Sequence, residues 1–201
     1  MSKPWKLVLA TRNAGKVREL RDLLAGLPVT LYTVADFPGA PAVDEDAPTL
    51  EGNALKKARA LHAHTGLPAL ADDTGLEVTT LGGRPGVHSA RFAGPDASDA
   101  DNRARLLEAL AGATDRSARF RTVVALVTAD GEHTFEGICT GRIVAAERGT
   151  GGFGYDALFV PDGETRTFAE LSPAEKNALS HRGQALRRVV AFLQQRIGSR
   201  T

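Results

Sequence analysis

The fold is decided by residues 7–24, which read LVLATRNAGKVRELRDLL. The first four residues are a short and wholly apolar run, the pattern of a buried strand. Beyond the polar residues 11–15 the periodicity changes, and Val17, Leu20 and Leu24 recur at helical spacing. The segment therefore predicts a strand, a polar loop and a helix.

The same alternation continues through the first half of the chain. Residues 29–34 predict a second strand, and residues 36–48 form a loop rich in proline and acidic side chains. A second amphipathic helix is expected around residues 54–61 and should end near Gly66. A buried strand is expected at residues 68–71.

The second half adds an antiparallel element. The buried strand should bend at residues 72–75 before it continues, and Asp130-Gly131 predicts a hairpin between two β-rich runs. Capping signals at Ser98 and Ser172 predict two further helices, with a break near residues 180–183. We therefore expect an α/β fold with a mixed sheet and flanking helices, as a single domain over residues 1–201.

Composition excludes several classes of protein. Twenty-five Lys and Arg oppose 24 Asp and Glu, so no global field would attract nucleic acid or an anionic membrane. Cys139 is the only cysteine, which excludes an internal disulfide and a cysteine zinc cluster. Nowhere do eighteen apolar residues run together, and the N-terminus is unlike a signal peptide. We expect a cytoplasmic protein with a buried, unreactive thiol.

Residues 11–16 form a candidate phosphate site. They lie between a strand and a helix, where free main-chain N–H groups and the positive end of the helix dipole can receive an anion. Lys16 adds a mobile charge, although the spacing is not that of a Walker loop. A purely structural helix cap is the alternative.

Two acidic segments form a candidate metal site. Asp72 and Asp73 follow an apolar strand, and on an extended backbone they point to opposite sides. One could bind metal while the other anchors structure, and carboxylate oxygens suit Mg²⁺. Residues 43–46 add three more carboxylates, and Asn53 and Lys57 share one helix face. A turn element and a solvated acidic loop are the alternatives.

A third segment suits a flat ligand. Residues 149–156 combine glycines with Phe153, Tyr155 and Asp156, so a base could approach the main chain and stack on an aromatic ring. Three potential cations follow within seven residues, namely Lys176, His181 and Arg182. A structural turn beside a charged helix is the alternative.

Taken together, these segments resemble the inosine triphosphate pyrophosphatase family, also called dITP/XTP pyrophosphatases. The resemblance spans residue 7 to about residue 190 and rests on six blocks in the right order: TRNAGK (11–16), EGNA (51–54), ADDTGL (71–76), LGGRPGV (81–87), GFGYD (152–156) and SHRG (180–183). It implies two lobes around a central cleft, a homodimer, and Mg²⁺-dependent hydrolysis of ITP, dITP and XTP to the monophosphate and pyrophosphate.

The resemblance also implies roles for individual residues. Asp73 would activate the attacking water and bind Mg²⁺, with Glu45 as the second metal carboxylate and Asp44 or Glu51 as alternatives. Thr74 stands where serine is commoner and keeps the hydroxyl. The substrate-binding residues would be Thr11, Arg12, Asn13, Ala14, Gly15 and Lys16 for the triphosphate, Asn53, Thr74 and Lys176, and Phe153, Gly154, Tyr155, Asp156, His181 and Arg182 for the base.

Two other functions stay open. A related pyrophosphatase for modified pyrimidine nucleotides could share the architecture, although the 153–156 and 181–182 segments favour a purine. A nucleotide-binding regulator would not need the paired carboxylates. Single-stranded nucleic-acid binding lacks the net positive charge that such proteins usually show.

Overall fold

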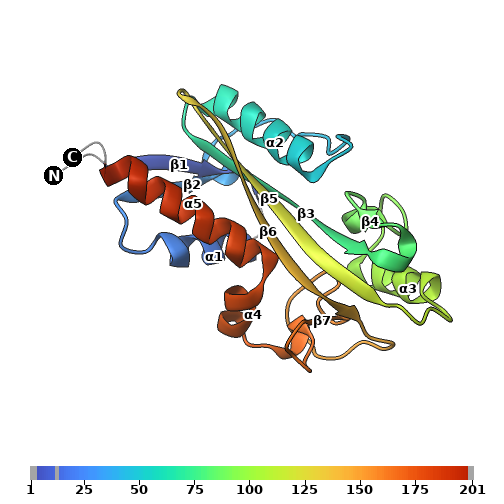
Figure 1. Cartoon of the computed structure of the whole chain (residues 1–201). Helices are drawn as coiled ribbons and strands as arrows, with labels where there is room; N and C mark the ends of the chain where they lie inside the picture. The colour runs from blue at the N-terminus through green and yellow to red at the C-terminus, as the bar shows by residue number, and fades with distance from the viewer. Residues whose placement is uncertain (1–3, 12–13, 199–201) are drawn as a thin grey trace. The chain divides into compact units, whose positions relative to one another are not determined.

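The computed structural model describes residues 4–11 and 14–198. Its main elements along the chain are shown in Figure 1. They are β1 Trp5–Leu9, α1 Ala14–Leu24, β2 Val29–Thr33, α2 Leu50–Thr65, β3 Ala69–Val78, β4 Pro85–Gly86, α3 Asp99–Ala109, β5 Ser117–Thr128, β6 Gly131–Ile143, β7 Phe159–Pro161, α4 Pro173–Leu179 and α5 His181–Gly198.

The strands form one seven-stranded mixed sheet in the order β2-β1-β3-β5-β6-β7, with β4 paired to β3. β1 is parallel to both β2 and β3, whereas β3 with β4 and β6 with β7 are antiparallel. The expected α/β fold with a mixed sheet and flanking helices is confirmed.

The chain divides into two compact units. Unit 1 comprises the described residues up to Asp73, Val123–Glu136, and those from Gly183 onward. Unit 2 comprises Thr74–Thr122 and Gly137–Arg182. A single domain and a cleft between two lobes stay predictions.

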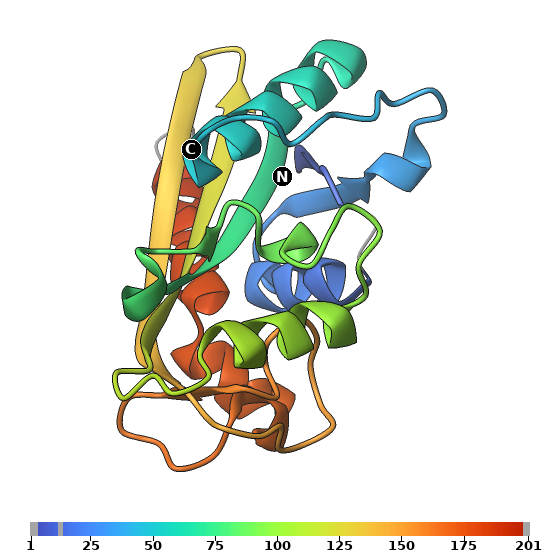
Figure 2. The ribbon, with the colours of Figure 1, turned by 90° about the vertical axis from the view of Figure 1, so that its right-hand side faces the viewer.

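Unit 1 buries both faces of its part of the sheet. Leu7 and Leu9 of β1 pack with α1 and α5, whereas Val8 between them packs with Leu61 of α2 on the opposite face. Figures 1 and 2 show α2 on the other side of these strands from α5. The short apolar run of β1 is therefore explained by burial on both sides.

Helix boundaries in unit 1 follow their caps. The hydroxyl of Thr49 accepts a hydrogen bond from the Gly52 N–H at the start of α2. Gly66 ends the helix in the left-handed conformation, with φ of 67°. The predicted end at Gly66 is thus confirmed.

Unit 2 has its own core around Phe120, Phe159 and Phe168, in which Leu106 of α3 and Ile143 of β6 are also buried. The predicted capping boxes at Ser98 and Ser172 are present at α3 and α4. α4 and α5 are separated by the extended residue Ser180, so the predicted break is confirmed as well.

The predicted bend at residues 72–75 is wrong, because β3 is one strand from Ala69 to Val78. A Cβ on Gly75 would lie 2.6 Å from the carbonyl oxygen of Gly86 in β4. Gly75 therefore permits close pairing between two strands rather than a turn. The hairpin lies one residue earlier than its Asp-Gly signal, since β6 already begins at Gly131.

Candidate active site

Asp72 and Asp73 are adjacent in β3, and their side chains contact different helices of unit 1. The ammonium of Lys16 in α1 lies 2.7 Å from Oδ2 of Asp72. On the other side, the side-chain amide of Asn53 in α2 donates to Oδ2 of Asp73 at 3.0 Å. Both carboxylates are buried, with relative exposures of 7% and 8%. The alternation of side chains along a strand thus gives the two aspartates separate partners.

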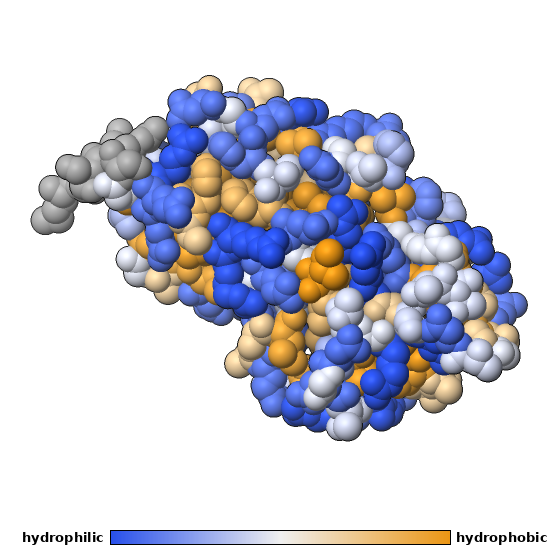
Figure 3. Space-filling model, viewed as in Figure 1, coloured by the Kyte–Doolittle hydropathy of each residue, from blue (hydrophilic) through white to orange (hydrophobic). Residues whose placement is uncertain are grey.

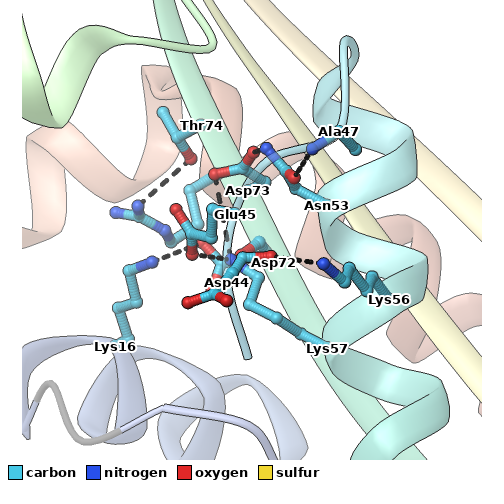
Figure 4. A network of polar contacts seen from close by, with 11 residues as sticks. Lys16, Asp44, Glu45, Ala47, Asn53, Lys56, Lys57, Asp72, Asp73 and Thr74 are labelled. Carbon is cyan, nitrogen blue, oxygen red and sulfur yellow. Dashed lines mark hydrogen bonds and ion pairs between the residues drawn. The ribbon is translucent and has the colours of Figure 1, made fainter. Parts of the chain in front are cut away.

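Lys57 joins the carboxylates of unit 1, as Figure 4 shows. Its ammonium lies 2.6 Å from Oε1 of Glu45 and 3.8 Å from Oδ1 of Asp73. It also donates to the main-chain oxygen of Asp72 at 2.7 Å. The sequence placed Lys57 on the same helix face as Asn53 but gave it no role. The four-residue spacing was the only signal.

Glu45 is distinguished from the neighbouring acidic residues by its partner. Asp46 instead pairs with Lys56 at 2.6 Å, and the main-chain oxygen of Asp44 accepts a hydrogen bond from Lys56 at 3.0 Å. Among the described residues, Glu45 is the one of these three whose ammonium partner, Lys57, also lies near Asp73. This geometry favours Glu45 over Asp44 as the second metal carboxylate.

Asn53 connects the acidic loop to β3. Its side-chain oxygen accepts from the Ala47 N–H at 2.9 Å, while its amide nitrogen donates to Asp73. The residue is fully buried. Asn53 is therefore placed to position Asp73, and its substrate contact stays a prediction.

The candidate phosphate loop is described in part. Arg12 and Asn13 lie outside the described residues, whereas α1 begins at Ala14, continues through Gly15 and carries Lys16. A cavity of about 250 Å³ in unit 1 is lined by Thr11 and Lys57 together with mainly apolar side chains of residues 34–43. Thr11 of the loop and Lys57 of α2 thus line the same cavity.

The donors of unit 1 fit a hard divalent cation. Within residues 4–11 and 14–198, no three His, Cys, Asp or Glu side chains form a ready metal cluster. Mg²⁺, however, usually takes only one or two carboxylates and completes its shell with waters and substrate phosphates. The Lys57 ammonium contacts both Asp73 and Glu45, which places the two carboxylates near each other. They would therefore supply such a pair of ligands.

In unit 2, an aromatic ring and two cations lie close together. The Phe153 ring is 42% exposed, with the Lys176 ammonium 4.8 Å and the Arg182 guanidinium carbon 5.5 Å from its centre. Lys176 also forms an ion pair with Asp156 at 2.5 Å. An exposed ring beside fixed donors can stack on a base and hydrogen-bond its edge.

Tyr155 and His181 contact the core of unit 2. The Tyr155 hydroxyl donates to the main-chain oxygen of Ser89 at 2.8 Å, and burial raises its pKa. The His181 ring is stacked on Phe120, with centroids 4.6 Å apart, and is 4% exposed. Both side chains are buried and contact other residues of unit 2. Their contact with a base stays a prediction.

The main chain of residues 151–156 is held by internal hydrogen bonds. The Gly154 N–H donates to Asp99 of α3 at 2.7 Å, and Arg103 of the same helix donates to the Gly154 oxygen at 3.0 Å. The Phe153 N–H donates to Asp156, and that of Gly151 to the Ala169 oxygen. Three main-chain donors are therefore already used within the protein.

In the part of the chain that the structure describes, every helix is too short or too polar to span a bilayer. Figure 3 shows hydrophilic residues interspersed with hydrophobic ones over the face in view.

Cys139 is buried in unit 2, and burial raises the pKa of its thiol to about 11.

Comparison with known proteins gives one family. Residues 7–192 match the model of the Ham1 family. A dITP/XTP pyrophosphatase of Geobacter sulfurreducens is 50% identical over 196 residues, which cover 96% of each chain. Another from Syntrophobacter fumaroxidans is 54% identical over 181 residues, covering 90% of this chain and 78% of that protein.

Solved structures give the same relationship. A HAM1 protein from Coxiella burnetii is 42% identical, with a TM-score of 0.90, and the match covers 95% of this chain and 99% of that one. A nucleoside-triphosphatase or dITP/XTP pyrophosphatase from Mycobacterium abscessus is 46% identical, with a TM-score of 0.76 and coverage of 92% and 98%.

Proposed function

Because the chain belongs to the Ham1 family, we propose that it hydrolyses the non-standard purine nucleotides ITP, dITP and XTP to the monophosphate and pyrophosphate. The observation that carries this proposal is the cluster of unit 1, in which Asp73 lies among Lys57, Glu45 and Asn53. Relatives about 50% identical over nearly the whole chain are dITP/XTP pyrophosphatases, which supports the same substrates.

The phosphate end of the nucleotide requires cations and a base. Lys16 and Lys57 supply two fixed ammonium groups, and the start of α1 supplies main-chain N–H groups for an anion. Asp73 would accept the proton of the attacking water, which must approach the α-phosphorus opposite the departing pyrophosphate. Asn53 holds the Asp73 carboxylate in place for this task.

The family implies a divalent metal, and we propose Mg²⁺. Asp73 and Glu45 would hold it, and when bound it would neutralise the crowded phosphate oxygens. Lys57 lies against both carboxylates, so it balances their charge when they stand close together.

The base end requires a stacking surface and donors for the 6-oxo group of hypoxanthine or xanthine. Phe153 offers the exposed ring, and Arg182 is the donor that we assign to the 6-oxo group. The N–H groups of Gly151, Phe153 and Gly154 already have partners, so selectivity falls on side chains. Adenine offers a donor at this position and would leave the guanidinium unpaired.

The decisive experiment measures pyrophosphate and IMP released from ITP by the purified protein in the presence of Mg²⁺. We expect stoichiometric release that stops with EDTA, and much slower turnover of ATP, UTP and dTTP. Equal rates with UTP and ITP, or release of inorganic phosphate in place of pyrophosphate, would contradict the proposal.

We also propose that the protein is a cytoplasmic homodimer. The location follows from the substrates, which belong to the nucleotide pool, and the dimer from the family resemblance. Size-exclusion chromatography with light scattering checks the assembly, for which one chain corresponds to 21.2 kDa.

A further inference from the structure

The glycine-rich segment 149–154 of unit 2 is anchored at two places. Near its start, the Gly151 N–H donates to the main-chain oxygen of Ala169 at 3.0 Å, and a Cβ on Gly151 would lie 2.9 Å from that oxygen. At its end, Gly154 is bonded to side chains of α3. Phe153, whose exposed ring we assign to the base, lies between these anchors. The position of its main chain therefore depends on both.

Two side chains of α3 hold both polar groups of the Gly154 main chain. Oδ2 of Asp99 accepts a hydrogen bond from the Gly154 N–H at 2.7 Å, and Nη1 of Arg103 donates to the Gly154 oxygen at 3.0 Å. Asp99 and Arg103 are four residues apart, so they share one face of the helix. The Gly154 N–H belongs to the peptide group that joins this residue to Phe153, so the pair of hydrogen bonds restrains the backbone directly beside the ring.

Arg103 also contacts the residue before the glycines. Its Nε lies 2.9 Å from Oε1 of Glu147, so one guanidinium joins Glu147 to Gly154. The Arg103 side chain is 18% exposed, whereas that of Glu147 is 43% exposed. Water screens an ion pair with an exposed partner, but a hydrogen bond from a charged donor to a main-chain oxygen keeps more of its strength. We therefore expect the contact with Gly154 to matter more.

Packing contributes little to holding Gly154. A cavity of about 200 Å³ separates α3 from the segment and is lined by Asp99, Arg103 and Glu147 together with residues of the segment itself. A Cβ on Gly154 would meet no described residue within 4 Å other than its chain neighbours. Glycine also allows many backbone conformations. Hydrogen bonds from α3 are therefore the main restraint on Gly154.

We propose that Arg103 is a positioning residue for the base of the bound nucleotide. It holds Gly154 and thereby keeps the Phe153 ring in the orientation that stacks on the base. A ring that is already ordered loses less conformational entropy when a ligand binds. The inference rests on the proposed function, which assigns the base to Phe153.

The test compares ITP hydrolysis by Arg103→Met and Arg105→Met. Methionine keeps an unbranched apolar stem and removes the charge and every donor. We expect Arg103→Met to raise KM about 3- to 10-fold, the effect of one hydrogen bond, with kcat within about twofold because other residues are assigned to the phosphates. Arg105 lies on the same helix and pairs with Glu108 at 2.6 Å on the exposed surface. Arg105→Met is therefore the matched control and should leave KM unchanged.

Two further variants separate positioning from structure. In a Phe153→Ala background, adding Arg103→Met should change KM less than about twofold, because both act through one ring. Glu147→Gln removes the ion pair and leaves the hydrogen bond to Gly154, so it should raise KM less than Arg103→Met does.

Amide hydrogen exchange of the ligand-free protein measures the restraint without any substrate. We expect residues 149–156 to exchange at least about threefold faster in Arg103→Met than in the wild type or in Arg105→Met. Equal exchange, an unchanged KM in Arg103→Met, or effects that multiply in the double variant would overturn the inference. So would a loss of kcat with unchanged KM that follows a lower Tm, which would show a structural role.

Wild-type activity on ITP in the same assay tests the proposed function separately. A wild-type protein that does not hydrolyse ITP would refute that function, whereas the exchange rates still decide whether Arg103 restrains the segment. The failure of one is therefore distinct from the failure of the other.

Discussion

Replacing Asp73 by Asn should remove turnover and leave the fold intact. The amide has nearly the same size, and its oxygen can still accept the Asn53 hydrogen bond that Oδ2 of Asp73 accepts at 3.0 Å. Lys57 keeps Glu45 at 2.6 Å and the Asp72 oxygen at 2.7 Å, so it is not left unpaired. The change removes only the charge that would bind metal and accept a proton.

The expected stability cost is the difference between a charged and a neutral hydrogen bond, about 1 kcal/mol. For a chain of this size that lowers Tm by about 2–4 °C. The expected loss in kcat is about 10³-fold or more, because the base and a metal ligand are lost together. Thermal unfolding and a pyrophosphate-release assay measure the two effects.

Asp72→Asn is the matched control. It removes the neighbouring carboxylate, whose partner is Lys16 rather than Asn53. We expect it to affect KM mainly and kcat about tenfold or less. The assigned roles would be refuted if Asp73→Asn kept a tenth of the wild-type kcat, or if both variants lost kcat equally.

Three further predictions concern separate groups. Lys16→Ala should raise the KM for ITP through lost phosphate contact, and unchanged KM and kcat would count against this role. Glu45→Gln should raise the Mg²⁺ concentration needed for half-maximal activity, because Glu45 shares Lys57 with Asp73. Asp44→Asn should not raise it, because the described contact of Asp44 is that of its main-chain oxygen with Lys56. A metal titration of both variants decides. The Cys139 thiol, with its pKa raised from 9.0 to about 11, should contain about 100-fold less thiolate at pH 8 than in the unfolded chain and react correspondingly slowly with a thiol reagent. Because the folded pKa is the higher one, this group's contribution to stability is present below pH 9 and is lost as the pH rises toward 11, which denaturant titrations at both pH values measure; equal thiol reactivity in native and denatured protein would contradict the burial.

Local sequence signals predicted the helices and strands well, because the residues that cause each of these signals lie close together in the sequence. The caps at Ser98 and Ser172 satisfy main-chain donors close in sequence, so a short window contains the whole interaction. The bend at residues 72–75 failed for the opposite reason. Gly75 is required by the approach of Gly86 in β4, and that contact becomes visible only when the two strands pair.

The candidate site likewise combines features that follow from neighbouring residues with contacts that form only in the folded chain. Adjacent aspartates on an extended strand were predicted to point to opposite sides, and their separate partners Lys16 and Asn53 agree with that geometry. The contact between Lys57 and Glu45 could not be predicted, because it forms only when the acidic loop folds onto α2.

The charges of unit 1 explain why a metal and a nucleotide should depend on each other. Glu45, Asp72 and Asp73 supply three carboxylates against the two ammonium groups of Lys16 and Lys57, while Asp46 and Lys56 neutralise one another. Among the described residues, these five side chains sum to one net negative charge, so by themselves they would repel a triphosphate. A divalent cation held by Glu45 and Asp73 would turn the sum for these five side chains positive, so the same residues would then attract phosphate. Lys57 therefore holds the carboxylates together without making the cluster attractive to the nucleotide by itself.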